Sequence, residues 1–295
     1  MGVTTIEWFG TTTFRVHTGG PVLFFDAYLD RIPGLDPVGL STAQVGAADF
    51  VFVSHAHFDH LYGAEAIAKG TGATVVGSPE VARCLRAGGV PEAQLLIVTG
   101  GETVDCGGGV GVRVLPALHS CLFAHGEPDT AIPCLGDLGV SAQDRIAARQ
   151  VFFDLASQLT GPAGESLQAM NAACSAHDGG QLSYLLHTGE GTALVSASAG
   201  YWSGIFTGLR PDVALLATGG RPNVDGEPYQ GSGAQYLVDQ VALLRPERVA
   251  LCHHDPLFPG FPGVDIGAAV QALTVPGAPA DYVAFEYATP RPLFG

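Results

Sequence analysis

The sequence predicts an α/β protein built from many short strands. Short apolar runs bounded by Gly, Asp or Pro recur through both halves of the 295 residues, and helical stretches separate several of them. The 41 glycines and 20 prolines suit frequent turns better than a long helical bundle. The chain has no short-period repeat and no low-complexity tract, so we expect one compact domain over residues 1–295.

The first half is rich in strands, and β-hairpins give way there to β-α alternation. One helix is expected in LYGAEAIAKG after position 60, and another in PEVARCLRAGG, where Pro79 suits the first turn and Gly88 the end. CGGGVGV at 106–112 predicts a tight hairpin turn. The seven strands expected in this half lie at about 3–8, 12–17, 21–26, 50–54, 73–77, 95–98 and 110–116.

Residues 121–180 break this pattern, because they contain no good strand. One amphipathic helix is expected in SAQDRIAARQVFFDLASQLTG, with Ser141 as its N-cap and Asp144 three residues on. The segments on both sides of this helix are typical of loops. We therefore expect a largely helical insertion over 121–180 that roofs the functional site, with a surface decoration as the alternative.

The second half repeats the β/α order of the first. Strands are expected near 181–187, 191–197, 213–217 and 248–252. Helices are expected near 201–208 and 231–244. The order indicates two similar β/α halves within a single domain.

The charge balance excludes several classes of partner. Thirteen Lys plus Arg against 28 Asp plus Glu give a net charge of -15, which repels polyanions, so no nucleic acid partner is expected. No apolar run approaches the roughly 20 residues that span a bilayer, so no membrane partner is expected either. The N-terminus has no basic region ahead of an apolar one, which favours a cytoplasmic protein. The six cysteines form no C-x-x-C pair, which argues against a zinc knuckle or a disulfide framework.

The segment ADFVFVSHAHFDHLYG carries the strongest functional signal. An apolar strand is followed within six residues by His55, His57, Asp59 and His60. Two histidines two apart on an extended backbone project to the same side, so one cation can take a nitrogen from each. Asp59 and His60 follow where the chain turns into the next helix, and they can face a second cation. The spacing therefore predicts a metal site.

Further histidines stand at the ends of two other apolar strands. VRVLPALHS supplies His119, and RVALCHHDP supplies His253 or His254. Adjacent strand residues point to opposite faces, so only one of His253 and His254 can enter a shared strand-end cleft.

These motifs resemble the metallo-β-lactamase superfamily over nearly the whole chain. The resemblance implies a four-layer αβ/βα sandwich with a metal site at one edge of two facing sheets. It also implies that Asp26 of FFDAYLD braces the metal loop and that His253 is favoured over His254. The implied ligand sets are His55, His57 and His119 for one metal, and Asp59, His60 and His253 for the other. FDAYLD, HFDHLYG and RVALCHHDP most resemble the branch that contains L-ascorbate-6-phosphate lactonase.

One position departs from the family pattern. The family's strand corresponding to TALVSASAGY usually ends in Gly-Asp-Thr or Gly-Asp-Ser, whose aspartate bridges both metals, and here the position holds Ser198. A serine hydroxyl is a weaker, uncharged ligand. We therefore expect one tight zinc site and a weak or absent second site, with Mn or Fe as alternatives to Zn. Asp255 or an acidic residue of the insertion can compensate, and the sequence leaves this open.

The predicted function is hydrolysis of a small ester, lactone, amide or phosphoester by a metal-activated water. The candidate catalytic residues are His55, His57 and Asp59, and Asp59 can orient or deprotonate the water where it is not mainly a ligand. One alternative is a catalytically silent binding or regulatory protein, which the replacement by Ser198 motivates. Another is a phosphodiesterase or nuclease, which the net acidity disfavours.

The substrate is expected to be small and neutral or partly apolar. Glu127 and Asp129 of the insertion would repel anions, and apolar residues accompany them. Homo-oligomerisation is left open. The candidate substrate contacts are His125, Arg221, Asn223 and Tyr229.

Overall fold

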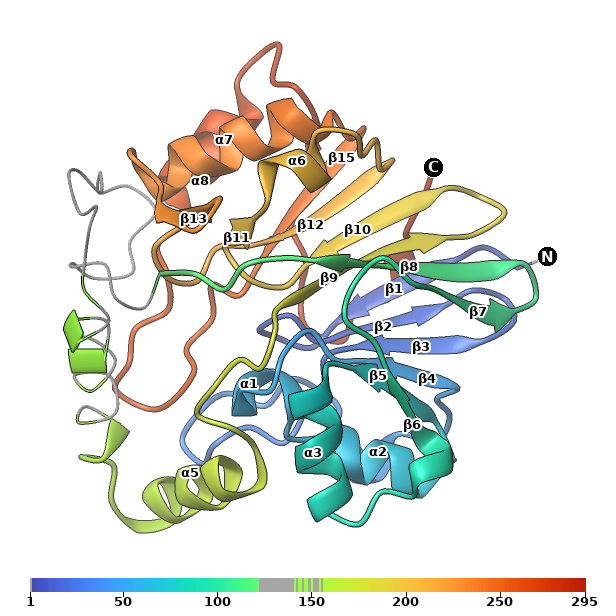
Figure 1. Cartoon of the computed structure of the whole chain (residues 1–295). Helices are drawn as coiled ribbons and strands as arrows, with labels where there is room; N and C mark the ends of the chain where they lie inside the picture. Colours follow the sequence, from blue (N-terminus) through green and yellow to red (C-terminus); the bar gives the residue numbers. More distant parts are fainter. Residues whose placement is uncertain are drawn as a thin grey trace.

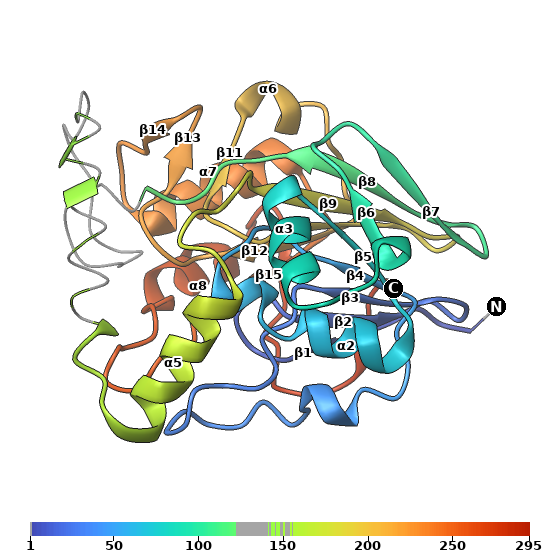
Figure 2. The same ribbon diagram turned by 60° about the horizontal axis from the view of Figure 1, so that its bottom comes forward.

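The computed structural model describes residues 2–121, 141, 143–144, 146–147, 150, 154 and 156–295. Two seven-stranded sheets face each other, and helices cover the outer face of each (Figure 1). In Figure 2, where the bottom of Figure 1 comes forward, α2 (Ala64–Thr71) and α3 (Pro79–Ala87) lie in front of the sheets. The predicted four-layer αβ/βα sandwich is therefore confirmed.

The first sheet begins with antiparallel hairpins and continues with parallel strands, as the change to β-α alternation predicted. Its strand order is β17-β1-β2-β3-β4-β5-β6. The strands of this sheet are, in that order, Arg291–Pro292, Thr5–Trp8, Phe14–His17, Val22–Phe25, Phe50–Phe52, Thr74–Gly77 and Leu95–Ile97. Strands β3 to β6 run parallel. Their carboxyl ends therefore lie at the same edge, where the loop after β4 emerges.

Helices α2 and α3 cover the outer face of this sheet (Figure 1). The local sequence explains where α3 begins, because Ser78 Oγ accepts a hydrogen bond from the Val81 amide and Pro79 occupies the first turn. The short 3₁₀ helices η1 (Thr42–Gln44) and η2 (Glu92–Gln94) lie in connecting loops.

The second sheet has the strand order β16-β15-β12-β10-β9-β8-β7. Its strands are, in that order, Asp281–Tyr282, Arg248–Cys252, Val213–Ala217, Thr192–Ser196, Leu182–His187, Val110–Pro116 and Thr103–Gly107. Strand β7 was not among the expected strands, because Asp105 and Gly107 interrupt its apolar residues. It pairs with β8 across the predicted hairpin, whose turn places Gly108 and Gly109 at positive φ.

Helices α6 (Ser203–Phe206), α7 (Gly233–Leu244) and α8 (Gly267–Thr274) lie on the outer side of the second sheet (Figure 1). A three-stranded sheet formed by β11 (Gly200–Tyr201), β13 (Asn223–Val224) and β14 (Glu227–Pro228) lies near them.

Three buried apolar clusters separate the four layers. The cluster between the sheets contains Phe14, Phe25, Phe52 and Tyr184, and the Tyr184 ring packs edge-on against Phe52 at 5.2 Å between centroids. The Tyr184 hydroxyl donates to the Val53 carbonyl at 2.7 Å. This bond joins the second sheet to the first sheet at Val53. The functional loop begins at the next residue, Ser54.

The region of the expected insertion contains a helix that the sequence interpretation missed. Residues 161–180 were expected to be loop, but α5 spans Gly161–Ala173. Pro162 occupies its first turn, and Leu167 and Met170 are buried in the cluster outside the first sheet, so helix propensity and tertiary burial favour the same state. The predicted cap is confirmed, because the Ser141 amide donates to Asp144 Oδ2 and the Asp144 amide donates to Ser141 Oγ, both at 3.1 Å.

The acidic loop residues Glu127 and Asp129, expected to repel anions, lie outside the described residues. The division of the chain into one domain with an insertion over 121–180 stays a prediction. Among the helices that the structure describes, none combines the length and apolarity needed to cross a membrane.

Candidate metal centre

The H-x-H-x-D-H segment changes from extended to helical backbone within six residues. Strand β4 ends at Phe52, and His57 keeps an extended backbone with φ -70° and ψ 156°. The single turn of α1 (Phe58–Leu61) then begins, and it contains Asp59 and His60. This change of backbone directs the two histidines before the turn and the two residues within it toward different neighbours.

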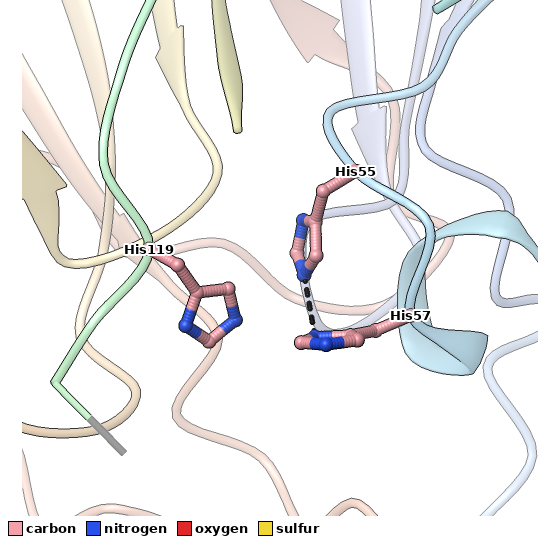
Figure 3. Close-up of side chains that lie close together, drawn as sticks. All are labelled: His55, His57 and His119. Carbon is pink, nitrogen blue, oxygen red and sulfur yellow. Dashed lines mark hydrogen bonds between the residues drawn. The ribbon is translucent and has the colours of Figure 1, made fainter. Parts of the chain in front are cut away.

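Three histidines form the first cluster. His55 Nε2 lies 3.0 Å from His57 Nδ1, and the ring centroid of His119 lies 4.9 Å from that of His55 and 4.8 Å from that of His57. Figure 3 shows the three imidazoles pointing toward one another from two separate segments, the loop after β4 and the loop after β8. One ring nitrogen from each histidine lies within 4.8 Å of the others.

Asp59, His60 and His253 form the second cluster. Asp59 Oδ2 lies 3.3 Å from His60 Nε2 and 3.3 Å from His253 Nε2. The centroids of the His55 and His60 rings are only 3.9 Å apart, so the two clusters are adjacent. The neighbouring His254 packs its ring against Trp8, at 5.1 Å between centroids. The structure thus brings His253, rather than His254, to the cluster.

The backbone around His253 explains this choice of face. His253 has a positive φ of 60°, which is uncommon for a residue other than glycine. Its amide donates to the Thr11 carbonyl at 2.8 Å, and this bond holds the chain in the turn after β15. Gly219 lies directly against the imidazole, because a Cβ on it would be 2.7 Å from His253 Nδ1.

The Nδ1 contacts indicate which ring nitrogens face the clusters. In three of the histidines Nδ1 is within hydrogen-bond distance of an oxygen. His60 Nδ1 is 2.7 Å from Asp26 Oδ2, His55 Nδ1 is 3.1 Å from Ser54 Oγ, and His119 Nδ1 is 3.0 Å from the Ser120 carbonyl. A proton on Nδ1 leaves the lone pair of Nε2 directed at the cluster. Nitrogen donors in this arrangement, together with one carboxylate, fit a divalent transition metal.

Electrostatics favour the protonation states that metal ligands need at Asp59 and His55, whereas His60 must lose a proton before its Nε2 can bind a metal. Burial raises the pKa of Asp59, but His60 and His253 outweigh this and hold it well below its ordinary value. Burial lowers the pKa of His60, whereas Asp59 and Asp26 raise it, and the result is about 10. Burial and the neighbouring histidines hold the pKa of His55 well below its ordinary value. Asp59 is therefore ionised and His55 neutral at pH 7.

Asp26, which the family resemblance selected as the residue that braces the metal loop, supports the clusters together with Thr11, Thr12 and Ser54, which the sequence interpretation did not select. Asp26 Oδ2 accepts from Thr12 Oγ1 at 2.5 Å and from Ser54 Oγ at 2.9 Å, in addition to its contact with His60. The Thr11 carbonyl holds the His253 amide. For Thr11 and Thr12 the sequence signal was the run TTT after Gly10, which is ordinary for a polar turn between two strands.

Asp255 does not compensate for the missing bridging carboxylate. It forms a buried ion pair with Arg31 at 2.7 Å, and it also accepts from the Thr11 amide at 2.8 Å and from the Tyr287 hydroxyl at 3.0 Å. The expectation that Asp255 replaces the bridging aspartate is therefore wrong. Ser198 Oγ accepts from the Ser120 amide at 3.0 Å and so supports the loop that carries His119.

One acidic residue of the expected insertion does approach the first cluster. The Ser175 amide donates to the Ala56 carbonyl and the Ala56 amide donates to the Asp178 carbonyl, both at 2.9 Å. This pairing holds residues 175–178 against the loop between His55 and His57. Burial lowers the pKa of His119, and the Asp178 carboxylate partly opposes this shift.

Two of the expected substrate contacts lie beside His119. Asn223 is buried, and its Nδ2 donates to the His119 carbonyl at 2.8 Å, so it supports the ligand loop. Arg221 is also buried, and its carbonyl accepts from the Cys121 amide at 2.8 Å.

The other two are not brought to the clusters. The Tyr229 hydroxyl donates to Asp239 on α7, and the Tyr229 ring packs against Tyr236. His125 lies outside the described residues.

Comparison with known proteins agrees with this geometry. A family model described as a beta-lactamase superfamily domain matches residues 22–136, which include the H-x-H-x-D-H segment and His119. A UPF0173 metal-dependent hydrolase of Pyrobaculum islandicum is 31% identical over 157 residues, which cover 51% of this chain and 69% of that protein. The chain belongs to the UPF0173 metal-dependent hydrolase family of the metallo-β-lactamase superfamily.

Other UPF0173 relatives match a shorter part. A UPF0173 metal-dependent hydrolase of Pyrobaculum arsenaticum is 37% identical over 115 residues, or 39% of this chain, and the chain spans half the length of that relative. Among solved structures, Igni18, a metallo hydrolase from Ignicoccus hospitalis, is similar to this chain with a TM-score of 0.63 at 17% identity. The superposition covers 98% of each chain. This likeness extends the fold assignment to the whole chain.

Proposed function

We propose that this UPF0173 family member is a metal-dependent hydrolase that binds metal through the two clusters. The observation that carries the proposal is the presence of two adjacent three-donor sets, each with its ligand atoms within 4.8 Å of one another. The proposed ligands are His55, His57 and His119 in the first set, and Asp59, His60 and His253 in the second.

A bound divalent cation supplies Lewis acidity and lowers the pKa of water to about 7. The protein's own groups supply orientation and proton handling. Asp59 lies between His60 and His253 and is ionised, so it can orient a water molecule and accept its proton where it is not fully occupied as a ligand. His55 and His57 complete the proposed catalytic group.

The two proposed sites differ in strength. Among the described residues, Asp59 is the one carboxylate in either set. Ser198 is uncharged and stands where the family pattern has the bridging aspartate, so no second carboxylate balances a second cation. The first set, with three nitrogens, favours tight binding of zinc, and the second set favours weaker binding. Manganese or iron are the alternatives that elemental analysis would distinguish.

We propose a small neutral ester or lactone as the substrate class, with amides and phosphoesters as the wider set. The net charge of -15 and the position of Asp178 near His119 disfavour an anionic substrate. The finer form of this proposal is the lactone-opening chemistry of the L-ascorbate-6-phosphate lactonase branch, acting here on an uncharged lactone. Arg221 and Asn223, beside His119, are the proposed contacts for a polar end of the substrate.

The test combines metal analysis with a substrate panel. Protein purified without chelator should contain stoichiometric metal and hydrolyse at least one lactone or ester, and His57→Ala should reduce kcat/KM at least about 1,000-fold, because a metal ligand is lost. His254→Ala is the matched control, since it removes a neighbouring histidine that packs on Trp8. Stoichiometric ligand capture without turnover would instead support a silent binding protein. Absence of bound metal would refute the proposal.

A further inference from the structure

The Ser54 hydroxyl lies where the two proposed ligand sets meet. Its Oγ is 2.9 Å from Asp26 Oδ2, 3.1 Å from His55 Nδ1 and 3.3 Å from His60 Nδ1. Ser54 is only 1% exposed, so these contacts are shielded from bulk water. The hydroxyl therefore touches one histidine of each set and the carboxylate between them.

The backbone fixes Ser54 in this place. Its amide donates to Asp26 Oδ1 at 2.7 Å, and its carbonyl accepts from the Leu182 amide at 2.8 Å. One neighbour, Val53, is held by the Tyr184 hydroxyl. The position of the hydroxyl is thus set by both sheets rather than by the side chain alone.

The donor and acceptor roles follow from the partners. An ionised carboxylate only accepts, so the single hydroxyl proton of Ser54 goes to Asp26. Ser54 Oγ can then accept the Nδ1 proton of His55. His60 Nδ1 has a shorter contact of its own with Asp26, at 2.7 Å, and donates there directly.

We propose that Ser54 is a positioning residue that extends the charge of Asp26 to His55 and so couples the two proposed metal sites. Asp26 orients His60 directly and His55 through the Ser54 hydroxyl. Both histidines keep the proton on Nδ1 and present Nε2 to their cluster. The proposal rests on the proposed metal centre for its consequence, but the tautomer itself is a property of the metal-free protein.

The first experiment needs no metal and no variant. Two-dimensional ¹H–¹⁵N spectra of the metal-free protein, recorded on the histidine ring nitrogens, should show the His55 proton on Nδ1. A proton on Nε2 of His55 would overturn the proposal. If the proton is on Nδ1 but the protein binds no metal, the proposed function fails while the hydrogen-bond relay stands, so the two failures are distinguishable.

Variants then test the relay. Ser54→Ala should shift the His55 ring proton toward a mixture of tautomers and lower the zinc affinity of the first set by about 10- to 100-fold, measured by competition with a chromophoric chelator. Ser54→Thr keeps the hydroxyl and should retain the wild-type tautomer. Thr12→Val is the matched control, because it removes a different hydroxyl from Asp26 and should leave the His55 signals unchanged.

A double-mutant cycle separates a relay from a merely structural role. If Ser54 acts through Asp26, Ser54→Ala should change first-set affinity less than about threefold in an Asp26→Asn background. The full 10- to 100-fold effect in that background would overturn the proposal, as would an unchanged His55 tautomer in Ser54→Ala. Circular dichroism checks that each variant folds. If a variant does not fold, the His55 tautomer measured in the wild-type protein still decides whether the proposal stands.

Discussion

Gly219→Ala should selectively damage the second proposed metal site. The added Cβ would lie 2.7 Å from His253 Nδ1, 3.1 Å from Cε1 and 3.2 Å from Cγ. Ordinary contacts begin at 3.4 Å, so the imidazole must retreat by about 0.7 Å. Metal–ligand distances tolerate only about 0.2 Å. We therefore expect the affinity of the second set to fall at least about 10-fold, with the first set unchanged.

The assay is a two-site metal titration against a chelator, with thermal unfolding as the check on the fold. Gly204→Ala is the matched control, because a Cβ there meets nothing within 4 Å and the residue lies in α6. It should leave both affinities unchanged. Wild-type affinity of the second set in Gly219→Ala would refute the reasoning, since it would mean that His253 is not held in place by this contact or is not a ligand.

Three further predictions concern charge. Ser198→Asp should raise metal content from nearer one to nearer two per chain, and unchanged content in elemental analysis would show that another group already bridges. Arg31→Met should lower the free energy of unfolding by about 3 kcal/mol, because it leaves Asp255 buried with an unpaired charge, and a denaturant titration that shows under 1 kcal/mol contradicts this. Asp178→Asn should lower KM for an anionic ester several-fold relative to a neutral one, and equal changes for both esters would remove Asp178 from the substrate path.

Much of the centre was predictable because its strongest signals are local. The H-x-H spacing on an extended backbone brings His55 and His57 together, and the turn of α1 directs Asp59 away from them. His119 and His253 were predictable for another reason, since strand carboxyl ends meet at one edge of the sandwich. Strand positions followed from apolar runs, because burial between two sheets requires them.

Among the groups that support the centre, the family resemblance selected Asp26, but Thr12 and Ser54 could not be predicted in the same way. Thr12, Asp26 and Ser54 meet only after β1 to β4 have paired, and the sequence contains no spacing rule for that contact. Helix α5 was missed because its few apolar residues, spread among Gly and Ala, carry a weak periodic signal that tertiary burial completes. The contact of Gly219 with His253 likewise depends on the turn after β15, which a positive φ creates.

The distribution of negative charge distinguishes this centre from one with a bridging aspartate. Asp59 is the one carboxylate within the two donor sets in the described part of the chain, while Asp26 lies behind the histidines and reaches them through hydrogen bonds. A carboxylate in that position strengthens its histidines as ligands but cannot bridge two cations. Stabilisation of two bound metals would then depend on hydrogen bonds through Ser54 more than on direct charge. For this reason Ser198→Asp and Ser54→Ala should have opposite effects on metal affinity, although each changes a single small side chain that supports the loops carrying the proposed ligands.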